Sequence, residues 1–241
     1  MTILRSAIFF IWFIAASVVI HIVLLPALVL PREAALWGGW IWSKAVLWGL
    51  RVFAGLDYVV RGEVPPDGAL IAAKHMSMWD TVGLYVSLNQ PLFVLKRELL
   101  RIPFFGWYVK KSGMIAIDRA GHAAALRKMA SAVRTTIESG RAVIIFPEGT
   151  RKKPGAQPDY KPGVAAVYGQ LDCPCVPVAL NSGLYWTGPG GFIKRKGTVV
   201  IEFLPPIPPG LKRREFMRAL EDRIETATAG LVAEGRTELA R

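Results

Sequence analysis

The chain has 241 residues, of which 52% are apolar and 20% charged, and its formal net charge at pH 7 is +12. The apolar content excludes an intrinsically disordered chain, and two cysteines are too few for a disulfide scaffold. The mean hydropathy of +0.34 favours association with a membrane. The positive charge suits an anionic partner, which could be nucleic acid, anionic lipid, a phosphorylated substrate or an acidic carrier protein.

Residues 7–30 form a continuous apolar run in which His21 is the only titratable side chain. A helix of about 20 such residues crosses the hydrocarbon core of a bilayer. A cleaved signal peptide is the alternative interpretation, but the run is longer than the usual apolar region of about 7–15 residues. We therefore expect this segment to be a membrane-embedded helix.

Residues 34–56 form a second apolar run, and Pro26 and Pro31 separate it from the first. Tryptophan prefers the boundary between lipid headgroups and hydrocarbon, and the second run contains Trp37, Trp40, Trp42 and Trp48. We expect residues 1–55 to form a membrane-embedded helical hairpin that anchors the chain, either across the bilayer or within one leaflet. Two buried core helices of a soluble protein are the alternative.

From residue 56 onward, short β-rich runs alternate with helical ones. The expected strands are Tyr58–Val60, Ala69–Ala73, Leu92–Leu95, Met114–Ile117, Ala142–Phe146, Val176–Leu180 and Thr198–Leu204. The expected helices are Asp80–Leu88, His122–Glu138, Val164–Gln170 and Lys212–Ala229. This alternation predicts an α/β domain over residues 56–241, with a mostly parallel sheet of about seven strands flanked by helices.

The first candidate for chemistry is the pair His75 and Asp80, which follows an apolar strand. Residues five apart lie about 140° apart around a helix, so the two side chains meet only if His75 is in the loop and Asp80 in the first helical turn. Ser77 followed by Asp80 fits a capping signal that starts a helix there. Asp80 could then accept the Nδ1 proton of His75 and leave Nε2 as a base. Alternatively, Asp80 only caps the helix and His75 is an ordinary loop residue.

Three further segments are candidates for substrate binding or for contact with a membrane. Residues 146–151, Phe-Pro-Glu-Gly-Thr-Arg, follow a strand and offer backbone N–H groups and a guanidinium to a phosphate or carboxylate. Alternatively, Glu148 and Arg151 pair with each other in a polar turn. Residues 95–106 mix basic and aromatic side chains, which suits a surface facing a membrane or an acyl chain or else a solvated amphipathic helix. Residues 176–183 form an apolar strand and turn that, taken alone, indicate only core.

In this order, the four segments resemble the glycerolipid acyltransferase family, most closely the 1-acylglycerol-3-phosphate acyltransferases. The family's H-x4-D motif falls on His75 and Asp80, its K-x-E-L-x-x-I-P-x-x-G segment starts at Lys96, F-P-E-G-T-R falls on residues 146–151, and V-P-V-A falls on residues 176–179. The resemblance covers roughly residues 60–205. Two departures are Lys74, where many members have Asn, and the lysines at 152 and 153, where Ser is common.

The resemblance implies transfer of a fatty acyl group from an acyl thioester to the 2-hydroxyl of 1-acylglycerol 3-phosphate, which gives phosphatidic acid. It implies His75 as general base, oriented by Asp80. The residues expected to bind substrate are Lys96, Arg119, Glu148, Gly149, Thr150 and Arg151. No metal or cofactor is expected.

The implied partners are the lysophospholipid acceptor, an acyl carrier protein or coenzyme A thioester, and anionic membrane lipid, with no nucleic acid. Because acyl thioesters are made in the cytosol, we expect an inner-membrane protein whose catalytic domain is on the cytoplasmic side. Other hypotheses are a different acceptor, such as lyso-ornithine lipid, and a non-enzymatic anionic-lipid-binding protein. A serine lipid hydrolase would need a G-x-S-x-G turn, which the sequence lacks.

Overall fold

The computed structural model describes residues 2–118, 122–187 and 191–240. Within these residues, seven strands form a sheet in the order β1-β7-β6-β2-β5-β3-β4. The strands are β1 (Leu56–Arg61), β2 (Leu70–Ala73), β3 (Leu92–Lys96), β4 (Ile115–Ile117), β5 (Val143–Ile145), β6 (Cys175–Leu180) and β7 (Gly197–Phe203). Each expected strand is present to within two residues at either end. Only the pairing of β6 with β7 is antiparallel, which confirms a mostly parallel sheet.

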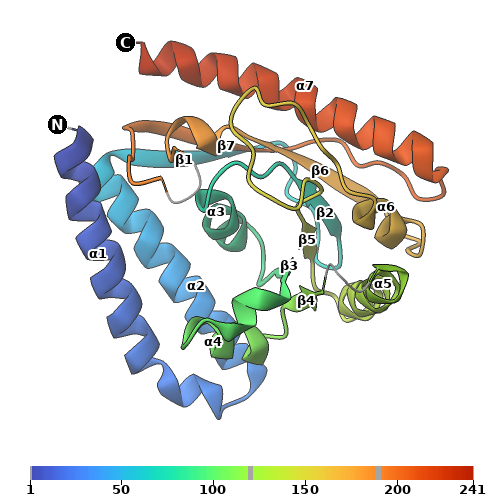
Figure 1. The fold of residues 1–241 in the computed structure, drawn as a ribbon, viewed down its shortest axis with the longest axis horizontal. Helices are drawn as coiled ribbons and strands as arrows, with labels where there is room; N and C mark the ends of the chain where they lie inside the picture. Colours follow the sequence, from blue (N-terminus) through green and yellow to red (C-terminus); the bar gives the residue numbers. More distant parts are fainter. Residues whose placement is uncertain (1, 119–121, 188–190, 241) are drawn as a thin grey trace.

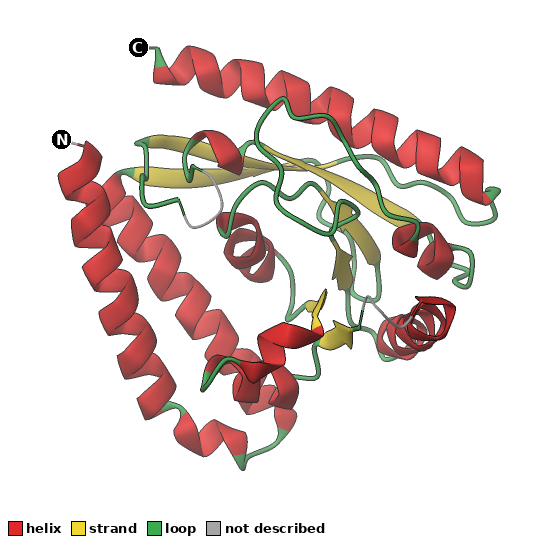
Figure 2. Ribbon diagram, in the orientation of Figure 1, coloured by secondary structure: helices red, strands yellow, loops and turns green. Residues whose placement is uncertain are grey.

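Helices cover both faces of the sheet (Figures 1 and 2). The α-helices are α1 (Thr2–Val23), α2 (Arg32–Gly49), α3 (Trp79–Ser87), α4 (Phe105–Lys111), α5 (His122–Glu138), α6 (Gly163–Tyr168) and α7 (Arg213–Leu239). Shorter helical turns are η1 (Leu25–Leu28), η2 (Leu50–Ala54), η3 (Arg97–Arg101) and η5 (Ser182–Leu184). One layer holds α2 and α3, and the opposite layer holds α5, α6 and α7.

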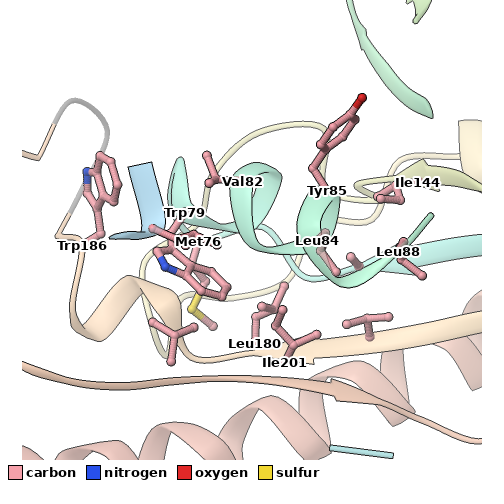
Figure 3. Close-up of a cluster of buried hydrophobic side chains, with 14 of the residues drawn as sticks. Met76, Trp79, Val82, Leu84, Tyr85, Leu88, Ile144, Leu180, Trp186 and Ile201 are labelled. Atoms are coloured by element: carbon pink, nitrogen blue, oxygen red, sulfur yellow. The ribbon is translucent and has the colours of Figure 1, made fainter. Parts of the chain in front are cut away.

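Alternate residues of the central strands enter two different clusters of buried side chains. In β2, Ile71 and Ala73 face the cluster under α2 and α3, whereas Leu70 and Ala72 face the cluster under α5, α6 and α7. This is the two-residue period of a strand buried on both faces. Figure 3 shows the first cluster, in which Leu84 of α3 points toward the strands below it.

The N-terminal helices α1 and α2 run in opposite directions, joined by η1 (Figure 1). Only α1 is long and apolar enough to be a candidate membrane span among the described residues, and 17% of its most apolar window is buried. The buried cluster that contains residues of the strands also contains residues of the N-terminal helices: Phe9 of α1, Val46 and Leu47 of α2, and Leu50 of η2. The boundary expected at residues 55/56 coincides with the start of β1, but the helix pair and the sheet share one core.

The segment expected as a basic and aromatic surface, residues 95–106, has Ile102 and Phe104 exposed. It contains η3 and the start of α4, which pack closely because Gly106 has no side chain: a Cβ there would lie 2.2 Å from the carbonyl oxygen of Leu100. The C-terminal helix differs from the expectation. Helix α7 continues ten residues beyond the predicted end at Ala229. Burial of Leu231 and Val232 in the core explains this extension, because tertiary packing overrides the low helix propensity of Gly230.

Candidate active site

His75 and Asp80 meet at the carboxyl end of β2. The sequence places His75 in the loop and Asp80 in the first turn of α3, and Nδ1 of His75 lies 2.9 Å from Oδ2 of Asp80. The expected contact is therefore present. The hydroxyl of Ser77 accepts a hydrogen bond from the backbone N–H of Trp79 at 3.1 Å, which satisfies one of the free N–H groups at the start of the helix.

The carboxylate of Asp80 is completely buried and accepts hydrogen bonds on both oxygens. Oδ2 accepts from the backbone N–H groups of Met76 at 2.6 Å and Ser77 at 2.8 Å, in addition to His75. The hydroxyl of Ser182 donates to Oδ1. These donors compensate the loss of water around the buried charge and fix the carboxylate plane against the imidazole.

The ring and backbone of His75 are held from several sides. The ring stacks on Phe146, with centroids 3.9 Å apart and planes inclined by 15°. The His75 carbonyl accepts from the backbone N–H of Lys152 at 2.8 Å, and its N–H donates to Oε2 of Glu148 at 3.4 Å. The turn at residues 146–152 therefore packs directly against the loop that carries the imidazole.

A cavity of about 640 Å³ begins at His75 and continues between the N-terminal helices and α4. Its lining is mostly apolar and comes from α1, α2, α3, β3 and α4: Phe13, Ile20, Ala35, Gly38, Gly39, Trp42, Ser43, Val82, Tyr85, Phe93, Leu95, Phe105, Tyr108 and Val109. A concave apolar site with a few convergent polar groups is typical of a ligand pocket. The cavity reaches the imidazole, whereas Asp80 lies behind it.

Four of the residues expected to bind substrate line the same cavity: Lys96, Gly149, Thr150 and Arg151. They come from the end of β3 and from the turn after β5, the carboxyl ends of parallel strands. Among the described residues, neither Lys96 nor Arg151 has a carboxylate within 4.0 Å. Within the part of the chain that the structure describes, these two positive charges therefore line a pocket that contains no carboxylate.

Among the described residues, one other expected site residue, Glu148, is not placed at the cavity. Glu148 is 1% exposed and is absent from the lining. Its Oε1 accepts from Nζ of Lys74 at 2.8 Å rather than from Arg151, and burial raises its pKa while the lysine opposes this. A direct contact with substrate does not fit this position. Arg119 lies outside the described residues.

The sequence did not single out Ser182 as a site residue. Its Asn-Ser-Gly context lacks a nucleophile motif, and only the register of β6 brings its hydroxyl to Asp80.

Among the described residues, no group of three or more His, Cys, Asp or Glu side chains is arranged to hold a metal ion. The arrangement is suited to proton transfer by His75, which lies next to a mostly apolar pocket that two cationic residues, Lys96 and Arg151, also line.

Comparison with known proteins gives consistent matches. The model of the Acyltransferase family matches residues 56–181. A 1-acyl-sn-glycerol-3-phosphate acyltransferase from Pseudomonas aeruginosa is 35% identical over 198 residues, which is 80% of this chain and 76% of that protein. An enzyme of the same name from Limnanthes douglasii is 31% identical over 67% of this chain and 59% of its own length.

A solved structure has the same fold. The 1-acyl-sn-glycerophosphate acyltransferase from Thermotoga maritima superposes with a TM-score of 0.77, covering 96% of this chain and 98% of that chain. The sequence identity is 21%, so this comparison supports the architecture of the sheet and its helices.

Proposed function

The chain belongs to the acyltransferase family, and we propose that it acts as a 1-acylglycerol-3-phosphate acyltransferase in which His75 is the general base. The reaction moves a fatty acyl group from an acyl thioester to the 2-hydroxyl of the acceptor and gives phosphatidic acid. The hydrogen bond between His75 and Asp80 at the cavity is the observation that carries the assignment of the base.

The proton path follows from this bond. Asp80 accepts the Nδ1 proton, so Nε2 of His75 keeps a lone pair. Nε2 removes the proton of the 2-hydroxyl as the oxygen attacks the thioester carbonyl carbon. The carbon–sulfur bond then breaks, and the imidazolium returns the proton to the thiolate. A positioned base of this kind contributes roughly 10²–10⁴-fold to the rate, and Asp80 stabilises the imidazolium.

Arg151 and Lys96 hold the phosphate of the acceptor in this proposal. A guanidinium donates two parallel hydrogen bonds to a phosphate, whereas an ammonium acts as a point charge. Both side chains line the cavity that contains His75. The backbone of Gly149 and Thr150 completes the site, which brings the 2-hydroxyl, two carbons from the phosphate ester, to the imidazole.

The apolar part of the cavity holds a fatty acyl chain. Each CH₂ group that leaves water for this lining contributes about 0.8 kcal/mol. Transfer of the chain from lipid into such a pocket replaces one apolar environment by another, so an enzyme that works at the bilayer avoids exposing its substrate to water.

The outer face of α1 and the tip of α4 supply the contact with the bilayer. Most of the large side chains on α1 are exposed, including Ile3 at 68% and Ile11 at 69%, and Trp107 of α4 is 52% exposed. Exposed apolar surface of this extent marks a membrane or protein contact, and interfacial tryptophan is typical of membrane proteins. Because thioester donors are cytosolic, the catalytic domain faces the cytoplasm of an inner membrane, and anionic lipid attracts its positive surface.

The test is product analysis with the protein in membranes or detergent, supplied with 1-acylglycerol 3-phosphate and either coenzyme A or acyl-carrier-protein thioesters. We expect phosphatidic acid from the wild type and a loss of roughly 10²-fold or more in His75→Ala and Asp80→Asn. Asp57→Asn, which removes a surface pair with Arg51, is the matched control and should keep its activity. Near-normal turnover by His75→Ala would exclude His75 from the mechanism.

A further inference from the structure

Lys74 is buried beneath the site, with its ammonium group bonded to two carboxylates. The residue is 2% exposed. Nζ donates to Oε1 of Glu148 at 2.8 Å and to Oε1 and Oε2 of Glu225 at 2.8 and 3.0 Å. Glu225 also accepts from the hydroxyl of Tyr160 at 2.9 Å. A lysine this deeply buried requires such partners because it has lost its hydration.

The partners come from three separate parts of the chain. Lys74 immediately precedes His75, Glu148 lies in the turn that ends at Arg151, and Glu225 belongs to α7. The second oxygen of Glu148 accepts from the backbone N–H of His75. The ion network therefore connects the loop of the base, the turn of the phosphate-binding arginine and the C-terminal helix.

We propose that Lys74 and Glu225 are positioning residues for acyl transfer, which hold the loop of His75 and the turn of Arg151 in register through Glu148. This inference rests on the proposed function of those two side chains. Neither Lys74 nor Glu225 lines the cavity, so they act through their neighbours. A displacement of about 1 Å between base and bound acceptor can cost roughly 100-fold in rate. The ion network would keep the rate high by preventing such a displacement.

The charges in the network predict what removal of the lysine does. One ammonium faces two carboxylates. Of the other titratable residues, Tyr160 donates to Glu225 through its hydroxyl, His75 donates to Glu148 through its backbone N–H, and the charge of Glu221 acts on Tyr160. In Lys74→Met, the buried Glu148 faces Glu225 without a cation, so its pKa, already raised by burial, rises further. When ionised, Glu148 repels Glu225 and displaces the turn. When protonated, it can donate to Glu225 and close the network again.

The experiment measures kcat and KM for 1-acylglycerol 3-phosphate between pH 6 and pH 9 in the full-length protein. For Lys74→Met we expect a loss of roughly 10- to 100-fold in kcat/KM, seen in both kcat and KM because both the base and the arginine move. The ratio of variant to wild-type activity should fall as the pH rises, since Glu148 ionises.

Two further variants separate positioning from general loss of structure. In Lys74→Met/Glu148→Gln, the amide of residue 148 can donate to Glu225 and accept from His75, so we expect recovery of activity and loss of the pH-dependent ratio. Glu225→Gln should reduce kcat/KM more weakly, by roughly 3- to 10-fold, because an amide still accepts from the lysine. Glu234→Gln is the matched control: it removes another bond from α7, to Arg61 at 2.9 Å on the surface, and should leave activity unchanged.

Hydrogen exchange of the backbone amides gives a readout that does not depend on turnover. Exchange at residues 146–152 should accelerate in Lys74→Met and Glu225→Gln but not in Glu234→Gln. Wild-type exchange and a wild-type pH profile in the first two variants would overturn the positioning role. A wild-type protein that makes no phosphatidic acid would instead refute the proposed function, and the exchange data would still decide whether the network holds the turn.

Discussion

The hydroxyl of Ser182 donates a hydrogen bond to Oδ1 of Asp80, although the two residues lie 102 positions apart in the sequence. Ser182 lies two residues beyond the end of β6, at the start of η5, and is fully buried. It also accepts a hydrogen bond from the hydroxyl of Ser77 at 2.8 Å. The end of β6 therefore contributes to the orientation of the carboxylate that holds His75.

Replacing Ser182 by alanine should slow acyl transfer with little change in acceptor binding. Oδ1 of Asp80 would lose its side-chain donor inside the protein, and an unsatisfied buried acceptor costs about 1–3 kcal/mol. We expect kcat to fall by roughly 10-fold while KM for 1-acylglycerol 3-phosphate stays near the wild-type value. Steady-state kinetics of Ser182→Ala measure this, with Ser87→Ala, which removes a serine bond at the other end of α3, as the control. A rise in KM at constant kcat would contradict the assignment.

Replacing Arg151 by alanine should weaken binding of phosphate-bearing acceptors. The guanidinium lines the cavity beside His75, and a hydrogen bond to a charged group contributes about 1.5–3 kcal/mol. We expect KM for 1-acylglycerol 3-phosphate to rise by roughly 10- to 100-fold, with partial recovery in Arg151→Lys. The neighbouring exposed Lys153, changed to alanine, provides the comparison. If Arg151→Ala turns over this acceptor normally, the phosphate is bound elsewhere.

The strands of this fold are predictable because each is a short apolar run bounded by turns, and a central strand buried on both faces requires such a run. The contact of His75 with Asp80 is also predictable, since the capping signal at Ser77 places one residue before the helix and the other inside it. In both cases, the determining interactions lie within a few residues of each other.

The remaining features depend on contacts between distant parts of the chain. Nothing local to Glu225 marks it, because an acidic residue on an amphipathic helix is usually solvated, and only the packing of α7 brings it to Lys74. The motif that contains Glu148 predicts that this residue binds substrate, whereas in the structure its carboxylate accepts a hydrogen bond from Lys74. The serine after β6 likewise acquires its partner from strand register alone.

The cavity predicts that a larger side chain at Ala35 will shorten the acyl chains accepted. Ala35 is buried, lines the cavity and lies in the first turn of α2, beside α4. Leucine there would fill space that otherwise holds about three CH₂ groups, each worth about 0.8 kcal/mol. We expect the preference for long over short thioesters to fall by roughly 10-fold or more in Ala35→Leu. Ala34→Leu, one position outside the lining, should keep the wild-type preference, and an unchanged profile in both variants would place the acyl chain elsewhere.

Lys194 connects the segment before β7 to α1. Its Nζ donates to the carbonyl oxygens of Gly191 and Phe192 at 2.9 and 3.0 Å and lies 4.4 Å from the ring centroid of Trp186 and 5.4 Å from that of Phe9. Aromatic faces attract a cation, but the group has lost most of its water. Burial lowers the pKa of Lys194 to about 8.

This lowered pKa predicts that the protein becomes more stable as the pH rises above about 8. Below that pH, Lys194 is protonated in both the folded and the unfolded chain, and the folded state bears the full cost of burying the charge. From about pH 8 to the ordinary lysine pKa of 10.5, the unfolded chain binds more protons, so the free energy of unfolding increases with pH. Thermal unfolding in detergent across this range should show the increase in the wild type and in Lys196→Met, an exposed neighbour, but not in Lys194→Met. Because tyrosines also titrate at the upper end of this range, the relevant quantity is the difference in unfolding temperature between the wild type and Lys194→Met. If this difference stays constant with pH, the buried amine does not change its protonation in this range.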